Sequence, residues 1–326
     1  MYKSLSKSSL FVLFLFFAMS FSLNAQYSYK EHTELGGVNW LRSLDDAKVK
    51  AAEAEKPVLI LFQEVPGCAT CRNYGQDALS HPLLVEAMET LFVPVAVFNN
   101  KGGKDKTTLA LFKEPSWNNP VVRVIDSEMN ELAPRLGSNY SKIGLLNTMI
   151  RSLINNKMPV PDYLYTLEEE FKAEKSRTKT KTYSMYCFWS GEKAFGQVEG
   201  VVQTEAGWKH GKEVVDVTFD TDVIEEVELD RIAKENSCSS MLKPGKFTQD
   251  KDPKYYLSKS PYRYVPMTEL QKARVNAAIG DGRSPNEFLS PMQLAYFKKI
   301  EKKEVEGKDL VKERDFEYAY NYFIKS

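Results

Sequence analysis

The chain has 326 residues, of which 43% are apolar, and its 44 basic residues balance its 44 acidic ones. This length allows two domains with separate cores, and a balanced charge gives no sign of a nucleic-acid partner or a strongly acidic one. After the N-terminal segment, no stretch approaches the about 18 consecutive apolar residues of a membrane-spanning helix. We therefore expect a soluble, two-domain mature protein.

The first 25 residues predict a secretory signal peptide. Lys3 and Lys7 precede an apolar run at 10–19, and Ala25 is a small residue suited to cleavage. The run is short for a spanning helix, although a retained N-terminal anchor is the alternative. We expect export to the periplasm or secretion, with no membrane attachment beyond the signal peptide. In such a compartment, disulfides between cysteines can persist.

Residues 26–156 alternate buried strands with helices, which is typical of an α/β domain. We expect, in chain order, a helix at 40–55, a strand at 57–62, a C-x-x-C at a helix start, a strand at 92–98, a short helix, a strand at 121–126 after a proline, and a helix at 141–154. The pair Cys68 and Cys71 closes a very small loop, which suits redox cycling better than stapling a fold. A structural disulfide and a metal half-site are the alternatives. Zinc would want a second C-x-x-C or a histidine pair, so we expect no metal.

This segment resembles the thioredoxin superfamily, with Cys68 and Cys71 at the dithiol positions and Pro120 at the cis-proline position. The resemblance implies that Cys68 is the exposed attacking thiol, whose thiolate a helix N-terminus stabilises, and that Cys71 is the buried resolving thiol. Ala69 and Thr70 stand where the family usually has other residues, and no tryptophan precedes Cys68. The reduction potential and the direction of electron flow therefore stay open.

A linker is expected at 157–181, with a charged helix at 164–175 and a polar basic loop at 176–182. The second domain, at 182–285, should contain strands at 183–188, 200–204 and 213–220, helices at 191–198 and 223–236, and a turn at 207–211. A helical tail at 286–326 carries an aromatic stripe at helical spacing, which predicts packing and no chemistry.

Several short motifs follow one another in the second domain. They are Cys187-Phe188-Trp189, Gly200-Val201-Val202-Gln203-Thr204, Gly207-Trp208, Glu213-Val214-Val215, and the tail motif at 256–264. With these motifs in this order, residues 182–266 resemble the A-type peptide methionine sulfoxide reductases. The resemblance implies a ferredoxin-like α+β fold and the reduction of methionine S-sulfoxide in oxidised proteins or peptides.

The resemblance also implies roles for individual residues. The Cys187 thiolate would attack the sulfoxide sulfur while Glu213 donates a proton to the oxygen. A carboxyl group can do so if an apolar surround raises its pKa. Phe188 and Trp189 would hold the substrate methyl group, and Trp208 stands in place of a tyrosine that hydrogen-bonds the oxygen in the family.

Turnover needs a second thiol. The sulfenic acid left on Cys187 would condense with Cys238 or, if Cys238 is too far away, with Cys68. The dithiol of Cys68 and Cys71, re-reduced by an external thiol–disulfide electron donor, would then recycle the enzyme without a cofactor.

The sequence also departs from the reductase family. Tyr186 replaces the glycine before the nucleophile, and Val265 occupies the place where many members carry a resolving cysteine. A second hypothesis therefore stays open, namely a thiol–disulfide oxidoreductase or a binding protein whose second domain is an inactive reductase remnant.

Overall fold

The computed structural model describes residues 32–241 and 245–325, so the expected signal peptide lies outside the described residues. The helices are α1 (Leu44–Ala54), α2 (Ala69–Gln76), α3 (Pro82–Leu91), α4 (Lys104–Leu111), α5 (Lys142–Asn155), α6 (Tyr163–Ala173), α7 (Phe188–Gly196), α8 (Glu226–Glu235), α9 (Tyr255–Ser258), α10 (Glu269–Gly280), α11 (Pro291–Glu301) and α12 (Phe316–Phe323). The strands are β1 (Val58–Gln63), β2 (Val93–Phe98), β3 (Val121–Ile125), β4 (Thr178–Ser184), β5 (Val201–Lys209), β6 (Lys212–Asp220), β7 (Ser239–Ser240) and β8 (Thr248–Gln249). Within this part of the chain, no helix is long and apolar enough to cross a membrane.

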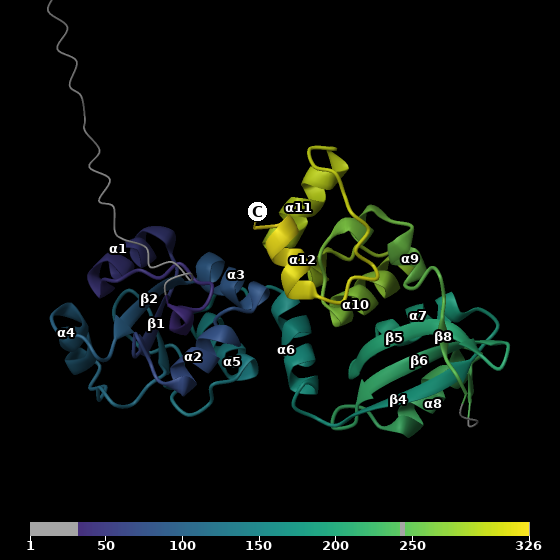
Figure 1. The fold of residues 1–326 in the computed structure, drawn as a ribbon, viewed down its shortest axis with the longest axis horizontal. Coiled ribbons are helices and arrows are strands. Elements are labelled where there is room, and N and C mark those ends of the chain that lie inside the picture. The colour runs from purple at the N-terminus through teal and green to yellow at the C-terminus, as the bar shows by residue number, and fades with distance from the viewer. Residues whose placement is uncertain (1–31, 242–244, 326) are drawn as a thin grey trace, which may run out of the picture.

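The first sheet lies between two layers of helices (Figure 1). Its strand order is β2-β1-β3, with β2 parallel and β3 antiparallel to β1. Every residue of β1 is buried, as the unbroken apolar run predicts for a strand covered on both faces. Leu59 and Leu61 face the core formed with α2, α3, α5 and α6, whereas Ile60 and Phe62 face the core formed with α1 and α4.

The first helix is shorter than the sequence suggested. It begins at Leu44 instead of residue 40, because the Ser43 hydroxyl accepts a hydrogen bond from the Asp46 N–H at 3.3 Å and so caps the helix. Leu41 instead bridges to Val95 beside the sheet, and Trp40 is fully buried.

The second sheet has the order β7-β4-β6-β5-β8, and every pairing in it is antiparallel. Along the chain, β4-α7-β5-β6-α8-β7 is a βαββαβ unit whose strands, numbered within the unit, have the order 4-1-3-2. This arrangement confirms the expected ferredoxin-like α+β fold. The hairpin between β5 and β6 turns at His210 and Gly211, both with positive φ, so the predicted turn at 207–211 is wrong in its first three residues, which continue β5.

The segment expected as a linker contributes to both domains. The apolar face of α6 is buried in the core of the first domain, through Leu164, Leu167 and Phe171. The polar loop expected at 176–182 is instead largely strand β4, which pairs with β6 along its whole length. The alternation of Thr and Lys is typical of a polar loop, but pairing with residues of β6 that lie 30 to 42 residues further along the chain makes the segment a strand.

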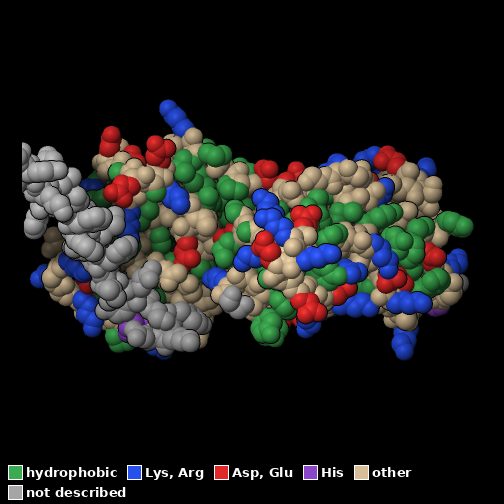
Figure 2. Space-filling model, turned by 90° about the horizontal axis from the view of Figure 1, so that it is seen from above, with side chains coloured by type: hydrophobic (Ala, Val, Ile, Leu, Met, Phe, Trp, Pro, Cys, Tyr) green, Lys and Arg blue, Asp and Glu red, His purple; other side chains and the backbone are tan. Residues whose placement is uncertain are grey.

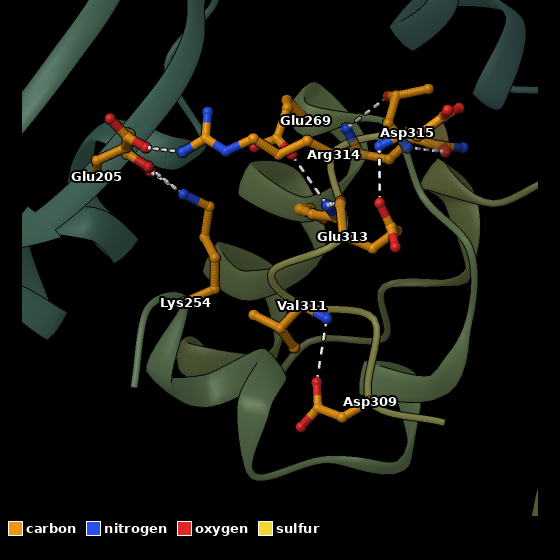
Figure 3. Close-up of polar contacts among 12 residues, drawn as sticks. Glu205, Lys254, Glu269, Asp309, Val311, Glu313, Arg314 and Asp315 are labelled. Atoms are coloured by element: carbon orange, nitrogen blue, oxygen red, sulfur yellow. Dashed lines mark hydrogen bonds and ion pairs between the residues drawn. The ribbon is translucent and has the colours of Figure 1, made fainter. Parts of the chain in front are cut away.

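The C-terminal region returns to the first domain, and α12 lies next to α3 and α6 (Figure 1). Tyr320 is fully buried there and donates its hydroxyl to Glu86 Oε2 at 2.5 Å, while the Met292 N–H donates to Glu86 Oε1 at 2.8 Å. Between these helices and the second sheet, Arg314 reaches Glu205 of β5 at 2.6 Å (Figure 3). The expected helical tail therefore contacts both domains.

Charged side chains of both signs are interspersed on the face shown in Figure 2, in keeping with the balanced composition. The surface shown has no broad area of one sign. An extended electrostatic attraction to a polyanion is therefore not a feature of this face.

A buried carboxyl group at the junction between the domains should make the stability of the fold depend on pH. Glu170 of α6 lines a cavity of about 570 Å³ between the first domain and the C-terminal segment, and its Oε2 has no hydrogen-bond partner. Burial raises the pKa of Glu170 from 4.5 to about 7. Because the folded protein holds this proton more tightly than the unfolded chain, the stabilisation is complete below pH 4.5 and is lost as the pH rises to about 7.

We therefore expect the unfolding free energy to fall by on the order of 3 kcal/mol between about pH 4.5 and pH 7.5 through this group. Glu170→Gln, which carries no ionisable proton, should flatten that dependence in chemical unfolding curves. Glu168→Gln, which removes only a surface ion pair with Lys172, is the matched control and should keep the slope. Equal slopes in wild type and Glu170→Gln would contradict the assignment.

Candidate active sites

The first candidate site is a dithiol at the start of α2. Cys68 is the exposed N-cap residue of this helix, and Cys71 in its first turn is fully buried. Their Sγ atoms are 3.4 Å apart and both are free thiols. Asn119-Pro120 is a cis peptide, as predicted for Pro120, and a second cis peptide, Val65-Pro66, which the sequence reading missed, lies just before the dithiol.

The two thiols differ in acidity. A hydrogen bond from the Cys71 backbone N–H is the largest cause that lowers the pKa of Cys68. Burial, followed by the neighbouring Cys68, raises the pKa of Cys71 to about 12. An exposed, more acidic thiol next to a buried, less acidic one suits nucleophilic attack by Cys68 followed by resolution by Cys71.

Two neighbours of the dithiol were missed from the sequence. The Cys71 thiol donates a hydrogen bond to Asn119 Oδ1 at 2.8 Å, and the same oxygen accepts the Glu64 N–H at 3.2 Å. A carboxylate oxygen of Glu64 lies within 4.8 Å of both sulfur atoms. Asn119 precedes the predicted cis proline, and Glu64 follows β1 directly, so their positions were visible in the sequence but their approach to the sulfurs was not.

The difference in pKa between the Cys68 and Cys71 thiols can be measured by alkylation. In a chain carrying Cys187→Ser and Cys238→Ser, we expect iodoacetamide to modify Cys68 with a pH midpoint below the about 8.5 of an unperturbed thiol, because only the thiolate reacts. Cys71 should stay unmodified until the protein is unfolded, since it is buried. Mass spectrometry of quenched samples gives both rates. Equal modification of the two cysteines at every pH would rule out this assignment.

The second candidate site lies at the start of α7. Cys187, which was predicted near the end of a strand, is instead the N-cap residue of this helix, because β4 ends at Ser184. The Phe188 N–H, the first of the helix, donates to Glu213 Oε2 at 2.9 Å. Trp208 and Glu213 are cross-strand partners in the β5–β6 hairpin. The structure thus brings Cys187, Glu213 and Trp208 together from separate elements.

Aromatic rings surround this helix start. The Phe188 ring is 5.4 Å from the Trp208 ring and 5.7 Å from the Trp189 ring, measured between centroids. Cys187 is partly exposed and Trp208 is 40% exposed, so the site is open to solvent and not sealed in the core.

Two further residues complete the aromatic surround. Tyr255 stacks on Trp189 with centroids 3.8 Å apart, and Asp250, which is buried, accepts a hydrogen bond from Trp189 Nε1 at 3.0 Å. Both precede the tail motif in sequence and gave no signal of their own. They fix the orientation of the Trp189 indole.

Cys238 and Cys68 are the two thiols proposed to resolve Cys187. Cys238 is buried, its Sγ is 3.8 Å from Met185 Sδ and 3.4 Å from the Asn236 carbonyl oxygen, and burial raises its pKa. Cys68 belongs to the other domain, and α6 lies between α2 and α7 (Figure 1). Direct attack by Cys68 on a sulfenic acid at Cys187 therefore requires the domains to move, or a second molecule.

The fold and site define the class of the first domain. Three features describe a thioredoxin-like dithiol domain: a sheet covered by helices on both faces, a C-x-x-C whose first cysteine is a helix N-cap, and a cis proline directly after the asparagine that accepts the Cys71 hydrogen bond. Residues 39–127 match the family described as Thioredoxin-like. The match ends before the second domain, whose resemblance to A-type reductases stays a prediction.

Comparison with solved structures and curated proteins adds two findings. A structure described as "DsbH Oxidoreductase" is 20% identical, with a TM-score of 0.28, and the alignment covers 32% of this chain and 76% of that chain. The comparison with curated proteins found no match.

Proposed function

We propose that the protein is an exported thiol–disulfide oxidoreductase that acts through Cys68 and Cys71. The observation that carries this proposal is the exposed Cys68 thiol, with its lowered pKa, 3.4 Å from the buried Cys71 thiol. The Cys68 thiolate attacks a substrate disulfide, which forms a mixed disulfide and releases one substrate thiolate. Cys71 then attacks Cys68 Sγ, which releases the second substrate thiolate and leaves a Cys68–Cys71 disulfide. Two electrons from an external thiol–disulfide donor restore the dithiol.

The experiment that tests this proposal is the reduction of insulin disulfides by the full chain, with dithiothreitol as electron source. We expect turnover well above the rate with dithiothreitol alone. The reduction potential of the Cys68–Cys71 pair, measured against glutathione, gives the direction in which the protein works. A rate equal to the uncatalysed one would overturn the proposal.

A second function, favoured by the geometry around Cys187, is the reduction of methionine S-sulfoxide in oxidised proteins or peptides. The supporting observation is that Glu213 accepts the Phe188 N–H at the start of α7, directly after Cys187, and that the Phe188 ring packs against the partly exposed Trp208 ring. The Cys187 thiolate attacks the sulfoxide sulfur as Glu213 protonates the oxygen. The oxygen passes to Cys187 as a sulfenic acid, so the substrate sulfur gains two electrons and the cysteine loses two.

A second thiol then condenses with the sulfenic acid and releases water. The Cys68–Cys71 dithiol is the reductant we propose for the resulting disulfide, after a domain movement or from a second molecule. The buried position of Cys238 and the fully buried Val265 at the usual resolving position favour the alternative in which this domain is inactive. Assays of the separate S- and R-epimers of a methionine sulfoxide peptide, with excess dithiothreitol, decide between an active reductase and an inactive remnant. Turnover of the S-epimer alone supports the reductase, and no turnover of either supports the inactive remnant.

A further inference from the structure

The reduced dithiol has more metal-binding atoms around it than disulfide exchange uses. The two Sγ atoms and a Glu64 carboxylate oxygen all lie within 4.8 Å of one another. Asn119 Oδ1 lies 2.8 Å from Cys71 Sγ on the side of the cis proline. We propose that this cluster binds a borderline divalent cation, with Zn²⁺ as the best fit, when the dithiol is reduced.

The spacing of the donors suits a four-coordinate ion. Zn²⁺ binds thiolate sulfur at about 2.3 Å and carboxylate oxygen at about 2.0–2.2 Å in tetrahedral geometry, which places neighbouring ligand atoms about 3.6–3.8 Å apart. The observed S–S distance of 3.4 Å is already close to that value. Glu64 is partly exposed, so its side chain has room for the shift of about 1 Å that would bring its oxygen to the ion. Asn119 Oδ1 or a water molecule supplies the fourth ligand.

The choice of metal follows from the donor set. Two thiolates with oxygen ligands suit Zn²⁺ or its spectroscopic substitute Co²⁺, whereas all-oxygen sites suit Mg²⁺ and Ca²⁺. Binding displaces the protons of both thiols, including the one that Cys71 now donates to Asn119, so it releases protons and strengthens as the pH rises.

The oxidation state of the dithiol decides whether the site exists. A Cys68–Cys71 disulfide consumes both sulfurs, and only the reduced form offers two thiolates. Bound Zn²⁺ in turn occupies Cys68 Sγ, which then cannot attack a disulfide or an alkylating agent. The cation therefore holds the reductant in a protected, inactive reduced form, and its removal restores the exposed thiol.

The sequence pointed away from this site because it holds one C-x-x-C and no histidine pair. The oxygen donors come instead from the end of β1 and from the loop before Pro120, 4 and 51 residues from Cys68 in the chain. Antiparallel pairing of β1 with β3 brings these two segments to the same end of the sheet.

Titration of the fully reduced chain with Co²⁺ under argon tests the proposal. We expect one equivalent per chain, with thiolate-to-cobalt charge-transfer absorption and the intense visible bands of a tetrahedral ion, and displacement by Zn²⁺. Glu64→Gln and Glu64→Ala should each raise the dissociation constant by about 10-fold or more. Cys68→Ser and Cys71→Ser, and the oxidised wild type, should lose the charge-transfer band. Glu53→Gln, at an exposed glutamate of α1, is the matched control and should bind as the wild type does.

Other outcomes overturn the proposal. Equal affinity in wild type and both Glu64 variants means that the dithiol alone binds the ion and that Glu64 is not a ligand. A band that persists in Cys68→Ser but is lost in Cys187→Ser places the metal at the other site. Unfolding curves of the Glu64 variants show that they are folded. The Co²⁺ titration does not depend on thiol–disulfide exchange activity. A chain that reduces no disulfide can still bind Co²⁺, and a chain that reduces disulfides can fail to bind it.

Discussion

Replacing Cys68 by Ser should abolish disulfide reduction, whereas replacing Cys71 by Ser should leave the protein covalently joined to its substrate. Of the two dithiol cysteines, Cys68 is the exposed one and has the lowered pKa, so we expect it to attack a substrate disulfide as a thiolate. A serine hydroxyl in its place is hardly ionised and cannot form a disulfide. We expect a loss in kcat/KM for insulin on the order of 10³-fold or more.

The Cys71 variant separates attack from resolution. Cys68 can still form the mixed disulfide, but Cys71 Sγ, 3.4 Å away in the wild type, is no longer there to release the substrate. The adduct should appear in non-reducing electrophoresis and by intact mass. Cys187→Ser, in the other domain, is the control and should reduce insulin at the wild-type rate. An active Cys68→Ser variant, or an adduct formed through Cys71, would contradict the assigned roles.

Replacing Cys187 by Ser should remove all reduction of methionine S-sulfoxide, with dithiothreitol present in excess. The reason is that the sulfoxide oxygen must be transferred to a thiolate, and Cys187 is the N-cap of the helix whose first N–H, that of Phe188, donates to Glu213. Glu213→Gln cannot donate a proton to the leaving oxygen, so we expect kcat to fall by about 10²–10⁴-fold.

The dithiol variants supply the cross-control for this experiment. With dithiothreitol as reductant, Cys68→Ser should keep sulfoxide reduction, because in this hypothesis the first domain contributes to that reaction only the electrons that recycle Cys187. With a protein electron donor in place of dithiothreitol, the same variant should fail. Sulfoxide turnover that survives Cys187→Ser would remove the reductase hypothesis and leave the disulfide exchange function standing alone.

Local patterns predicted the parts of the fold whose cause is local. The apolar run 57–62 made a buried strand, and the C-x-x-C after a turn made a helix start with one exposed and one buried cysteine. In the second domain, the resemblance to A-type reductases implied a ferredoxin-like α+β fold, and the observed strand order agrees with it. The short last strand, β7, was not among the predicted strands.

The predictions from the sequence were wrong where a segment that is distant in the chain determines the local structure. The sequence of β4 predicts a basic loop, but backbone hydrogen bonds to β6 make this segment a strand. The early end of β4 then moves Cys187 from a strand to a helix cap. The sequence of the amphipathic helix α6 predicts a linker between domains, but the apolar face of this helix is buried in the core of the first domain.

By itself, the sequence of this protein predicted the two fold types and the pair Cys68 and Cys71 at the start of a helix. The attacking and resolving roles of the two cysteines, and the roles assigned to the residues near Cys187, stay predictions. The tertiary structure alone decided that Glu64 and Asn119 approach the dithiol and that Asp250 and Tyr255 hold Trp189. It also decided that Cys238 is buried and that Cys68 belongs to the other domain from Cys187. The physical reason is one of range along the chain. The spacing of apolar residues and the residue types in turns determine structure over a few residues, whereas contacts between distant segments depend on strand register and domain packing across tens of residues.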